Sequence, residues 1–297
     1  MEYKSGFIAV MGRPNVGKST LMNRLLGQTI AAVSPKPQTT RLQQLGILTL
    51  ENAQLVFIDT PGLHHPHHKL GEFMNQDALL ALEDADLALL ILDASTPPTD
   101  EDLLFGKALR ELKTPPPVLL VLNKIDSVRA NELGERQDQY QALLPGAQLI
   151  PISAATGANL DELEGKVIEA LPEGPPLYPE EQVTDLYERE IAADLIRAAA
   201  MNLLEEELPH VIAVRIDEYM EREDGSAYIE ATLFVERDSQ KGILIGEGGS
   251  MIKAIGIGAR KEIEAMSGRK VFLRLRVKVK KNWRNDLNAL RLFGFKK

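Results

Sequence analysis

The chain has 297 residues, of which 44% are hydrophobic and 26% are charged, as is ordinary for a globular protein. It contains no cysteine, which excludes disulfides, thiolate metal sites and cysteine nucleophiles. The net charge of −9 is unevenly distributed, because residues 236–297 carry +10 and the rest of the chain carries −19. We therefore expect contact with a polyanion only in the C-terminal third.

Targeting and membrane signals are weak. Residues 1–6 do not show the charged-then-apolar layout of a signal peptide. The longest apolar run, Leu87–Leu92, lies between two aspartates and is too short to span a bilayer. These features predict a cytoplasmic protein.

Short apolar runs alternate with helical patterns over the first 170 residues, which predicts an α/β domain with a mostly parallel sheet between helices. The runs Leu45–Leu50 and Leu55–Ile58 are close enough in the sequence to form a hairpin. Strands are expected at Gly6–Met11, Leu45–Leu50, Leu55–Ile58, Leu87–Leu92, Val118–Leu122 and Leu149–Ile152. Helices are expected near Lys18–Leu26, Lys69–Leu82, Glu101–Leu112, Glu132–Leu144 and Leu160–Leu171.

A proline- and glycine-rich segment, Pro172–Pro176, indicates a domain boundary. We divide the chain into a first domain (1–172), a linker (173–183) and a second domain (184–297). The order α-β-β-α-α-β predicts an α+β fold for the second domain. Its elements are expected at Thr184–Leu204, Val211–Tyr219, Tyr228–Val235, Gln240–Ile245, Ser250–Met266 and Val271–Val279, before an amphipathic stretch at Leu287–Phe295.

Residues 12–19 read GRPNVGKS and fit the phosphate-binding pattern G-x-x-x-x-G-K-[ST] between a strand and a helix. Glycines let the main-chain N–H groups approach a β-phosphate, and the helix N-terminus favours negative charge. Lys18 is expected to bridge the β- and γ-phosphates, and the Ser19 hydroxyl to bind Mg2+. The residues expected at the phosphates are Gly12, Asn15, Val16, Gly17, Lys18, Ser19 and Thr20.

The sequence Asn123-Lys124-Ile125-Asp126 follows a buried strand and predicts a preference for guanine. The carboxylate of Asp126 can accept hydrogen bonds from N1–H and the 2-amino group of guanine, and adenine lacks both donors. Asn123 is expected at the N7 edge, and the Ala154 N–H at O6. The full set expected around the base is Asn123, Lys124, Asp126, Ser153, Ala154 and Ala155.

Two polar loops resemble switch segments that order around a γ-phosphate. Asp59 is expected to hold Mg2+ through water, and the Gly62 N–H to contact the γ-phosphate. Thr40 is the preferred second magnesium ligand, with Thr39 as the alternative. The remaining residues expected in this part of the site are Thr60 and Pro61.

Four histidines, His64, His65, His67 and His68, lie within five residues. They cannot all face one ion in an extended loop, and an exposed switch loop accounts for them better than a metal site.

The motifs resemble those of the TRAFAC-class GTPases, and more narrowly the Era family, over the whole chain. The resemblance implies a Ras-like P-loop GTPase domain that hydrolyses GTP to GDP and phosphate with Mg2+. Ras-like enzymes carry a water-orienting glutamine where this chain has Leu63. Relatives with an asparagine matching Asn15 use K+ in place of a missing arginine, and we carry that over as a hypothesis. The catalytic candidates are Lys18, Thr40, Asp59, Gly62 and Asn15.

Residues 246–249 read GEGG and fit the G-x-x-G loop of KH domains, where a sugar–phosphate backbone passes too close for side chains. Ile243, Ile245, Ile252 and Ile255 are expected to line an apolar groove for bases. Residues 274–280 alternate basic and apolar side chains, as in a strand with one basic face. Trp283 is interpreted as core packing. The expected RNA contacts are Lys241, Ile243, Gly246, Glu247, Gly248, Gly249, Lys253, Arg274, Arg276 and Lys278.

The resemblance implies a type II KH domain that binds single-stranded RNA near the 3′ end of 16S ribosomal RNA, in assembly of the small (30S) ribosomal subunit. It implies a GTP/GDP switch, and we expect a monomer. One alternative is a scaffold in which GTP binding is structural and hydrolysis secondary. Another is peripheral contact with the inner face of the cell membrane through the basic surface.

Overall fold

The computed structural model describes residues 2–295, and the chain forms two compact units. The first unit comprises residues up to Gln28, Thr40–Pro66 and Met74–Asp185. The second comprises Thr29–Thr39, His67–Phe73 and the chain from Leu186 onward. Two short segments that lie early in the sequence therefore belong to the second unit.

The first unit contains a six-stranded sheet in the order β2-β3-β1-β4-β5-β6. β2 is antiparallel to β3, which confirms the expected hairpin, and the other neighbouring pairs are parallel. The strands are β1 (Lys4–Met11), β2 (Gln44–Thr49), β3 (Ala53–Asp59), β4 (Leu87–Asp93), β5 (Val118–Asn123) and β6 (Gln148–Pro151). The helices are α1 (Lys18–Leu26), α2 (Lys69–Glu83), α3 (Asp102–Glu111), α4 (Ala130–Gln141) and α5 (Leu160–Ala170), with a short 3-10 turn η1 (Ile125–Ser127).

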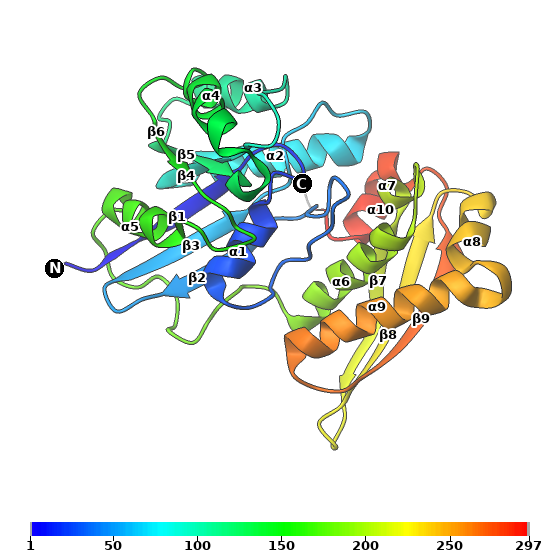
Figure 1. The fold of residues 1–297 in the computed structure, drawn as a ribbon. Helices are drawn as coiled ribbons and strands as arrows, with labels where there is room; N and C mark the ends of the chain where they lie inside the picture. Colours follow the sequence, from blue (N-terminus) through cyan, green and yellow to red (C-terminus); the bar gives the residue numbers. More distant parts are fainter. Residues whose placement is uncertain (1, 296–297) are drawn as a thin grey trace. The chain divides into compact units, whose positions relative to one another are not determined.

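Helices cover both faces of this sheet (Figure 1). Buried side chains of α2, α3 and α4, among them Leu82, Phe105 and Tyr140, share one core with alternate residues of the strands. α1 and α5 lie on the other face (Figure 1). β3 and β4 are buried along their whole length, as expected of strands enclosed between helices. The loops that carry the nucleotide motifs therefore follow the carboxyl ends of β1, β3, β5 and β6, where ligands bind in such sheets.

Residues 173–183 lie along the first unit. Ser5 donates through its N–H to the Pro172 carbonyl and through its hydroxyl to the Pro175 carbonyl, at 3.2 and 2.7 Å. The Gln54 side chain accepts from the N–H groups of Leu177 and Tyr178. The interval treated as a linker in the sequence is thus hydrogen bonded to β1 and β3.

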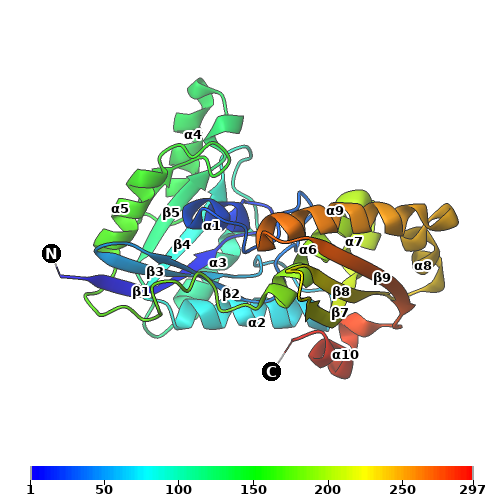
Figure 2. The same ribbon diagram turned by 90° about the horizontal axis from the view of Figure 1, so that it is seen from below.

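The second unit contains a three-stranded sheet in the order β7-β8-β9, with β8 antiparallel to β7 and parallel to β9. α6 and α9 pack on one face of it (Figure 2). Its elements are α6 (Glu188–Leu203), α7 (Leu208–Val211), β7 (Ala213–Glu221), β8 (Ala227–Val235), α8 (Asp238–Ile245), η2 (Glu247–Gly249), α9 (Ser250–Ser267), β9 (Val271–Val279), η3 (Trp283–Asn285) and α10 (Leu287–Leu292).

Three details of this unit bear on the sequence expectations. The strand expected from Val211 begins at Ala213, because the short helix α7, with Pro209 in its first turn, occupies the preceding residues. Trp283 is fully buried, and its Nε1 donates to the Val211 carbonyl at 2.8 Å, which confirms its role in the core. Ile255 is also fully buried in the core, so its expected place in an open groove was wrong.

None of the helices within residues 2–295 is both long enough and apolar enough to cross a membrane.

Candidate nucleotide and RNA sites

The loop between β1 and α1 wraps around the side chain of Lys18. Its Nζ donates to the carbonyls of Gly12 and Arg13, at 3.0 Å each. Burial lowers the pKa of this lysine to about 8, although Asp59 acts in the opposite direction. Gly17 has a φ of 101°, and a Cβ there would collide with the Asn123 side chain. The glycine is therefore required both by backbone conformation and by the close approach of the next loop.

Ser19, Thr40 and Asp59 converge on one point, and we call them the hydroxyl–carboxylate cluster. The Ser19 hydroxyl lies 2.9 Å from the Thr40 hydroxyl and donates to Asp59 Oδ2 at 2.9 Å. The Thr40 hydroxyl donates to the same oxygen at 3.0 Å. Among the described residues, Asp59 Oδ1 is buried without a hydrogen-bond partner. Burial raises the pKa of Asp59, against the opposing effects of Lys18 and of hydrogen bonds.

This cluster fits a hard divalent cation. Two hydroxyls and a carboxylate are oxygen ligands of the kind that Mg2+ prefers beside phosphates and water. A bound cation would also compensate the buried Asp59 carboxylate, whose second oxygen has no partner among the described residues. Thr39 points elsewhere, because its hydroxyl donates to the Lys36 carbonyl at 2.9 Å.

We call residues 123–126, which are expected to recognise guanine, the guanine-recognition loop. Its first two residues tie it to the phosphate loop. Asn123 Nδ2 donates to the Val16 carbonyl at 2.8 Å, and Asn123 Oδ1 accepts from the Ala154 N–H at 2.9 Å. Lys124 Nζ donates to the Asn15 carbonyl at 2.7 Å. Asn123 is 2% exposed. It therefore holds three loops in place, in addition to any contact with a base.

Asp126 lies exposed at the rim of this loop and accepts a hydrogen bond from the Ser153 hydroxyl. That hydrogen bond is the main cause that lowers the pKa of Asp126 below its ordinary value. The carboxylate is therefore ionised at neutral pH and able to accept from two donors of guanine.

Sequence reasoning missed three charged residues near these loops, which are Arg13, Asp93 and Asp102. Lys124 Nζ donates to Asp93 Oδ2 at 2.6 Å, and Arg13 forms an ion pair with buried Asp102 at 3.3 Å. Burial raises the pKa of Asp93, but hydrogen bonds from Lys124 and Ser95 outweigh it and lower the pKa overall. One signal was available in the sequence, because Asp93 directly follows the apolar run Leu87–Leu92. In the structure it pairs in register with Asn123.

The loop after Asp59 contains Leu63 and the histidines. Leu63 is 5% exposed and packs in the core of the first unit, so its side chain cannot orient a water. His64 is turned inward, and its Nδ1 lies 3.0 Å from the Gly62 carbonyl. His65 and His67 are exposed. Across residues 2–295, no group of three or more histidine, aspartate or glutamate side chains could hold a metal ion.

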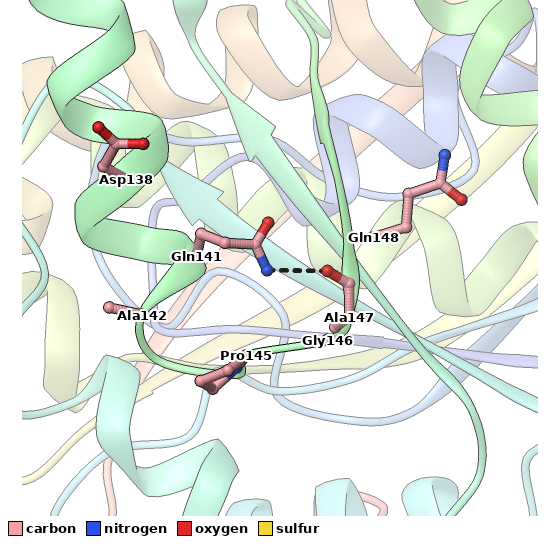
Figure 3. Close-up of a pocket in the computed structure, with 7 residues that line it drawn as sticks. All are labelled: Asp138, Gln141, Ala142, Pro145, Gly146, Ala147 and Gln148. Carbon is pink, nitrogen blue, oxygen red and sulfur yellow. Dashed lines mark hydrogen bonds between the residues drawn. The ribbon is translucent and has the colours of Figure 1, made fainter.

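A shallow surface pocket lies between the end of α4 and the start of β6 (Figure 3). Gln141 Nε2 donates to the Ala147 carbonyl across it at 2.8 Å. None of its lining residues belongs to the nucleotide or RNA motifs: Asp138, Gln141, Ala142, Pro145, Gly146, Ala147 and Gln148.

The structure divides the expected RNA contacts into two groups. Lys241, Ile243, the Gly246–Gly249 loop and Lys253 lie on α8, η2 and α9, on the helical side of the sheet. Ile243 is 56% exposed there. Gly248 has a φ of 58°, and a Cβ at this position would point into open space. This exposed apolar and cationic surface suits a nucleic-acid strand.

The second group, Arg274, Arg276 and Lys278, occupies the exposed positions of β9. Their alternation with half-buried Leu275 and Val277, which pack on the core, places them on the face away from α6 and α9. Glu230 of β8 pairs with Arg276 at 2.6 Å and with Arg274 at 3.5 Å. Part of the basic charge expected to meet RNA is thus neutralised within the sheet.

Known proteins resemble both halves of the chain. Residues 7–124 match the family model described as 50S ribosome-binding GTPase, and residues 207–284 match the KH domain model. The GTPase Era of Heliobacterium modesticaldum is 47% identical over 292 residues, covering 98% of this chain and 97% of that protein. The chain belongs to the Era family of GTPases.

Another Era GTPase, from Carboxydothermus hydrogenoformans, is 47% identical over 296 residues, with 99% of each chain covered. The chain is also similar to a crystal structure of Era in complex with MgGDPNP and nucleotides 1506–1542 of 16S ribosomal RNA. The TM-score is 0.93 and the sequence identity is 40%, and the match covers 99% of this chain and 100% of the other. An Era variant of Aquifex aeolicus bound to GDP·AlF4− gives a TM-score of 0.92, also at 40% identity, with the same coverage. The Ras-like GTPase fold followed by a KH domain, the GTPase activity and the binding of GTP and GDP are therefore those of the Era family.

Proposed function

We propose that this protein is a magnesium-dependent GTPase switch that binds single-stranded RNA at the 3′ end of 16S ribosomal RNA during assembly of the 30S subunit. The observation that carries the proposal is the hydroxyl–carboxylate cluster, in which the phosphate loop and both switch loops meet through Ser19, Thr40 and Asp59. A relative 40% identical over nearly the whole chain was crystallised with MgGDPNP and that RNA.

Different residues of the chain have different roles in the proposed hydrolysis. Lys18 supplies positive charge to the β- and γ-phosphate oxygens, and the N–H of Gly62 contacts the γ-phosphate when the second loop orders. Ser19, Thr40 and, through water, Asp59 would hold Mg2+, which would supply positive charge beside the phosphates. Because Leu63 is apolar and buried, no side chain at that position orients the attacking water. We expect slow intrinsic turnover that RNA or a partner accelerates.

K+ belongs to this proposal as an additional cofactor at Asn15, which has a φ of 65° in the phosphate loop. A monovalent cation there would supply the positive charge that an arginine provides in other GTPases. Equal hydrolysis rates in sodium and potassium, or an unchanged rate in Asn15→Ala, would remove K+ from the mechanism.

For location, we propose the cytoplasm, because GTP and ribosomal RNA, the two proposed ligands, are both found there. We also propose that the protein is a monomer. Peripheral contact with a membrane through the basic strand β9 is the second possibility. The ion pairs of Glu230 with Arg274 and Arg276 weaken it, since they neutralise part of the charge that would attract anionic lipid.

The RNA target is tested by sequencing RNA crosslinked to the wild type, to Gly248→Asp and to Gly225→Asp. Gly225 is a matched control, because it also has a positive φ, 79°, and open space, but lies in the turn between β7 and β8. We expect a discrete peak at the 3′ end of 16S ribosomal RNA that only Gly248→Asp abolishes. Loss in both variants, or in neither, would contradict the assignment of the Gly246–Gly249 loop.

A further inference from the structure

The loop that follows Gly62 is held against α2 by the side chain of Asn75. Asn75 Nδ2 donates to the His64 carbonyl at 2.7 Å, and Asn75 Oδ1 accepts from the His64 N–H at 3.4 Å. Both main-chain groups of His64 therefore pair with one side chain, as they would with a neighbouring strand. All these residues belong to the first unit, which includes Thr40–Pro66 and Met74–Asp185.

The part of α2 around Asn75 is anchored within the same unit. Ala78 is fully buried and belongs to the same hydrophobic core as Leu63. Gln43, the residue before β2, donates through its side chain to the Asp77 carbonyl. Asn75 therefore lies on a helix turn with a fixed position, from which it can hold the loop.

The ring of His64 carries this restraint to Gly62. Its Nδ1 lies 3.0 Å from the Gly62 carbonyl and must carry the hydrogen, because a carbonyl can only accept. Gly62 also packs directly on the phosphate loop, since a Cβ there would lie 2.6 Å from the Pro14 nitrogen. The position of Gly62 is thus restrained both by the phosphate loop and by the loop that Asn75 holds.

We propose that Asn75 is a positioning residue for GTP hydrolysis, which holds the main chain of His64 so that the Gly62 N–H stays directed at the γ-phosphate. The inference rests on the role of Gly62 proposed above. Asn75 lies outside the nucleotide motifs of the sequence, and it acts on the γ-phosphate only through His64 and Gly62.

The test is a double-mutant cycle between Asn75→Ala and His64→Ala in the full-length protein. Asn75→Asp keeps the shape of the side chain but lacks the donor that meets the His64 carbonyl. Gln76→Ala, at an exposed neighbour on the same helix, is the matched control. Single-turnover GTP hydrolysis is measured together with the affinities for GDP and for a non-hydrolysable GTP analogue, and thermal unfolding reports whether each variant folds.

We expect Asn75→Ala and Asn75→Asp each to lower the single-turnover rate about tenfold, because the Gly62 N–H is displaced from the γ-phosphate. Affinity for the analogue should fall at least about threefold, whereas GDP affinity should stay within about twofold of wild type, because GDP lacks the γ-phosphate around which switch loops order. Gln76→Ala should match wild type. In the His64→Ala background, Asn75→Ala should change the rate by less than about twofold, since it acts through that histidine.

A wild-type rate in Asn75→Ala and Asn75→Asp would overturn the proposal. So would an equal loss of affinity for GDP and for the analogue, which a merely structural role predicts, or a full additional tenfold loss in the His64→Ala background. Failure of the underlying function would look different, because Gly62→Ala would then itself hydrolyse GTP at the wild-type rate. If Asn75→Ala does not fold, the isosteric Asn75→Asp decides in the same way, in both His64 backgrounds.

Discussion

Lys124 Nζ lies 2.6 Å from Asp93 Oδ2, and this ion pair joins the guanine-recognition loop to the end of β4. The same Nζ donates to the Asn15 carbonyl of the phosphate loop. Lys124 therefore spans the two halves of the nucleotide site, and Asp93 sets the position from which it does so.

Replacing Asp93 with asparagine removes the charge that holds Lys124. We expect GDP and GTP affinity each to fall about tenfold, which corresponds to about 1.4 kcal/mol, while the preference for guanine over adenine stays unchanged. Fluorescent nucleotide titration measures both quantities, with exposed Asp84→Asn as the control. A changed base preference would show that Asp93 acts on Asp126 as well.

Asp126→Asn should alter base selection. An asparagine offers an N–H donor where guanine presents donors of its own, so GDP affinity should fall at least about a hundredfold. Xanthine carries a carbonyl at that edge and should be bound better by the variant than by wild type. Competition between GDP and XDP measures this exchange, and an unchanged GDP affinity would exclude Asp126 from base recognition.

Ser153→Ala should change the pH dependence of GDP binding. The Ser153 hydroxyl lowers the pKa of Asp126, and the ionised carboxylate is the form that accepts from guanine. Affinity is therefore constant above the pKa and falls as the pH decreases through it. Without the hydroxyl the pKa rises, so the loss in the variant should begin at a higher pH. Coincident pH profiles would contradict this role.

Lys253→Gln and Arg274→Gln separate the two groups of basic residues. Lys253 is exposed on the helical side of the sheet, whereas Arg274 lies 3.5 Å from Glu230 on the opposite side. We expect Lys253→Gln to weaken RNA binding and to reduce the salt slope by about one, the signature of one lost phosphate contact. Arg274→Gln should change neither by a comparable amount. The reverse result would place RNA on the face of the sheet away from α6 and α9.

Much of the nucleotide site could be predicted from the sequence, because its motifs are local. The helix expected at Lys18–Leu26 coincides with α1, and apolar runs locate each strand of the first sheet to within a few residues. Contacts distant in sequence could not be predicted. Arg197 looks like any charged residue of a helix, and nothing near it indicates that it is buried against Thr39, 158 residues away.

The second unit was harder to predict from the sequence, for a related reason. Ile255 has the spacing and the neighbours of a groove residue, but the α6–α9 packing buries it completely. The alternation in β9 correctly indicated one basic face. It could not indicate that Glu230, on a parallel neighbour in register with Arg274, would pair with that face.

A GTPase switch that acts on RNA must bind RNA differently in its GTP and GDP states, and this control of RNA binding by the nucleotide state is the central claim of the proposed function. The most direct measurement is the affinity of the protein for an RNA oligonucleotide of the 16S 3′ end, with saturating GDP and with saturating non-hydrolysable GTP analogue. We predict binding at least about tenfold tighter with the analogue, a coupling of about 1.4 kcal/mol. Equal affinities would contradict the account, because a ligand with no differential effect on two states cannot shift their equilibrium.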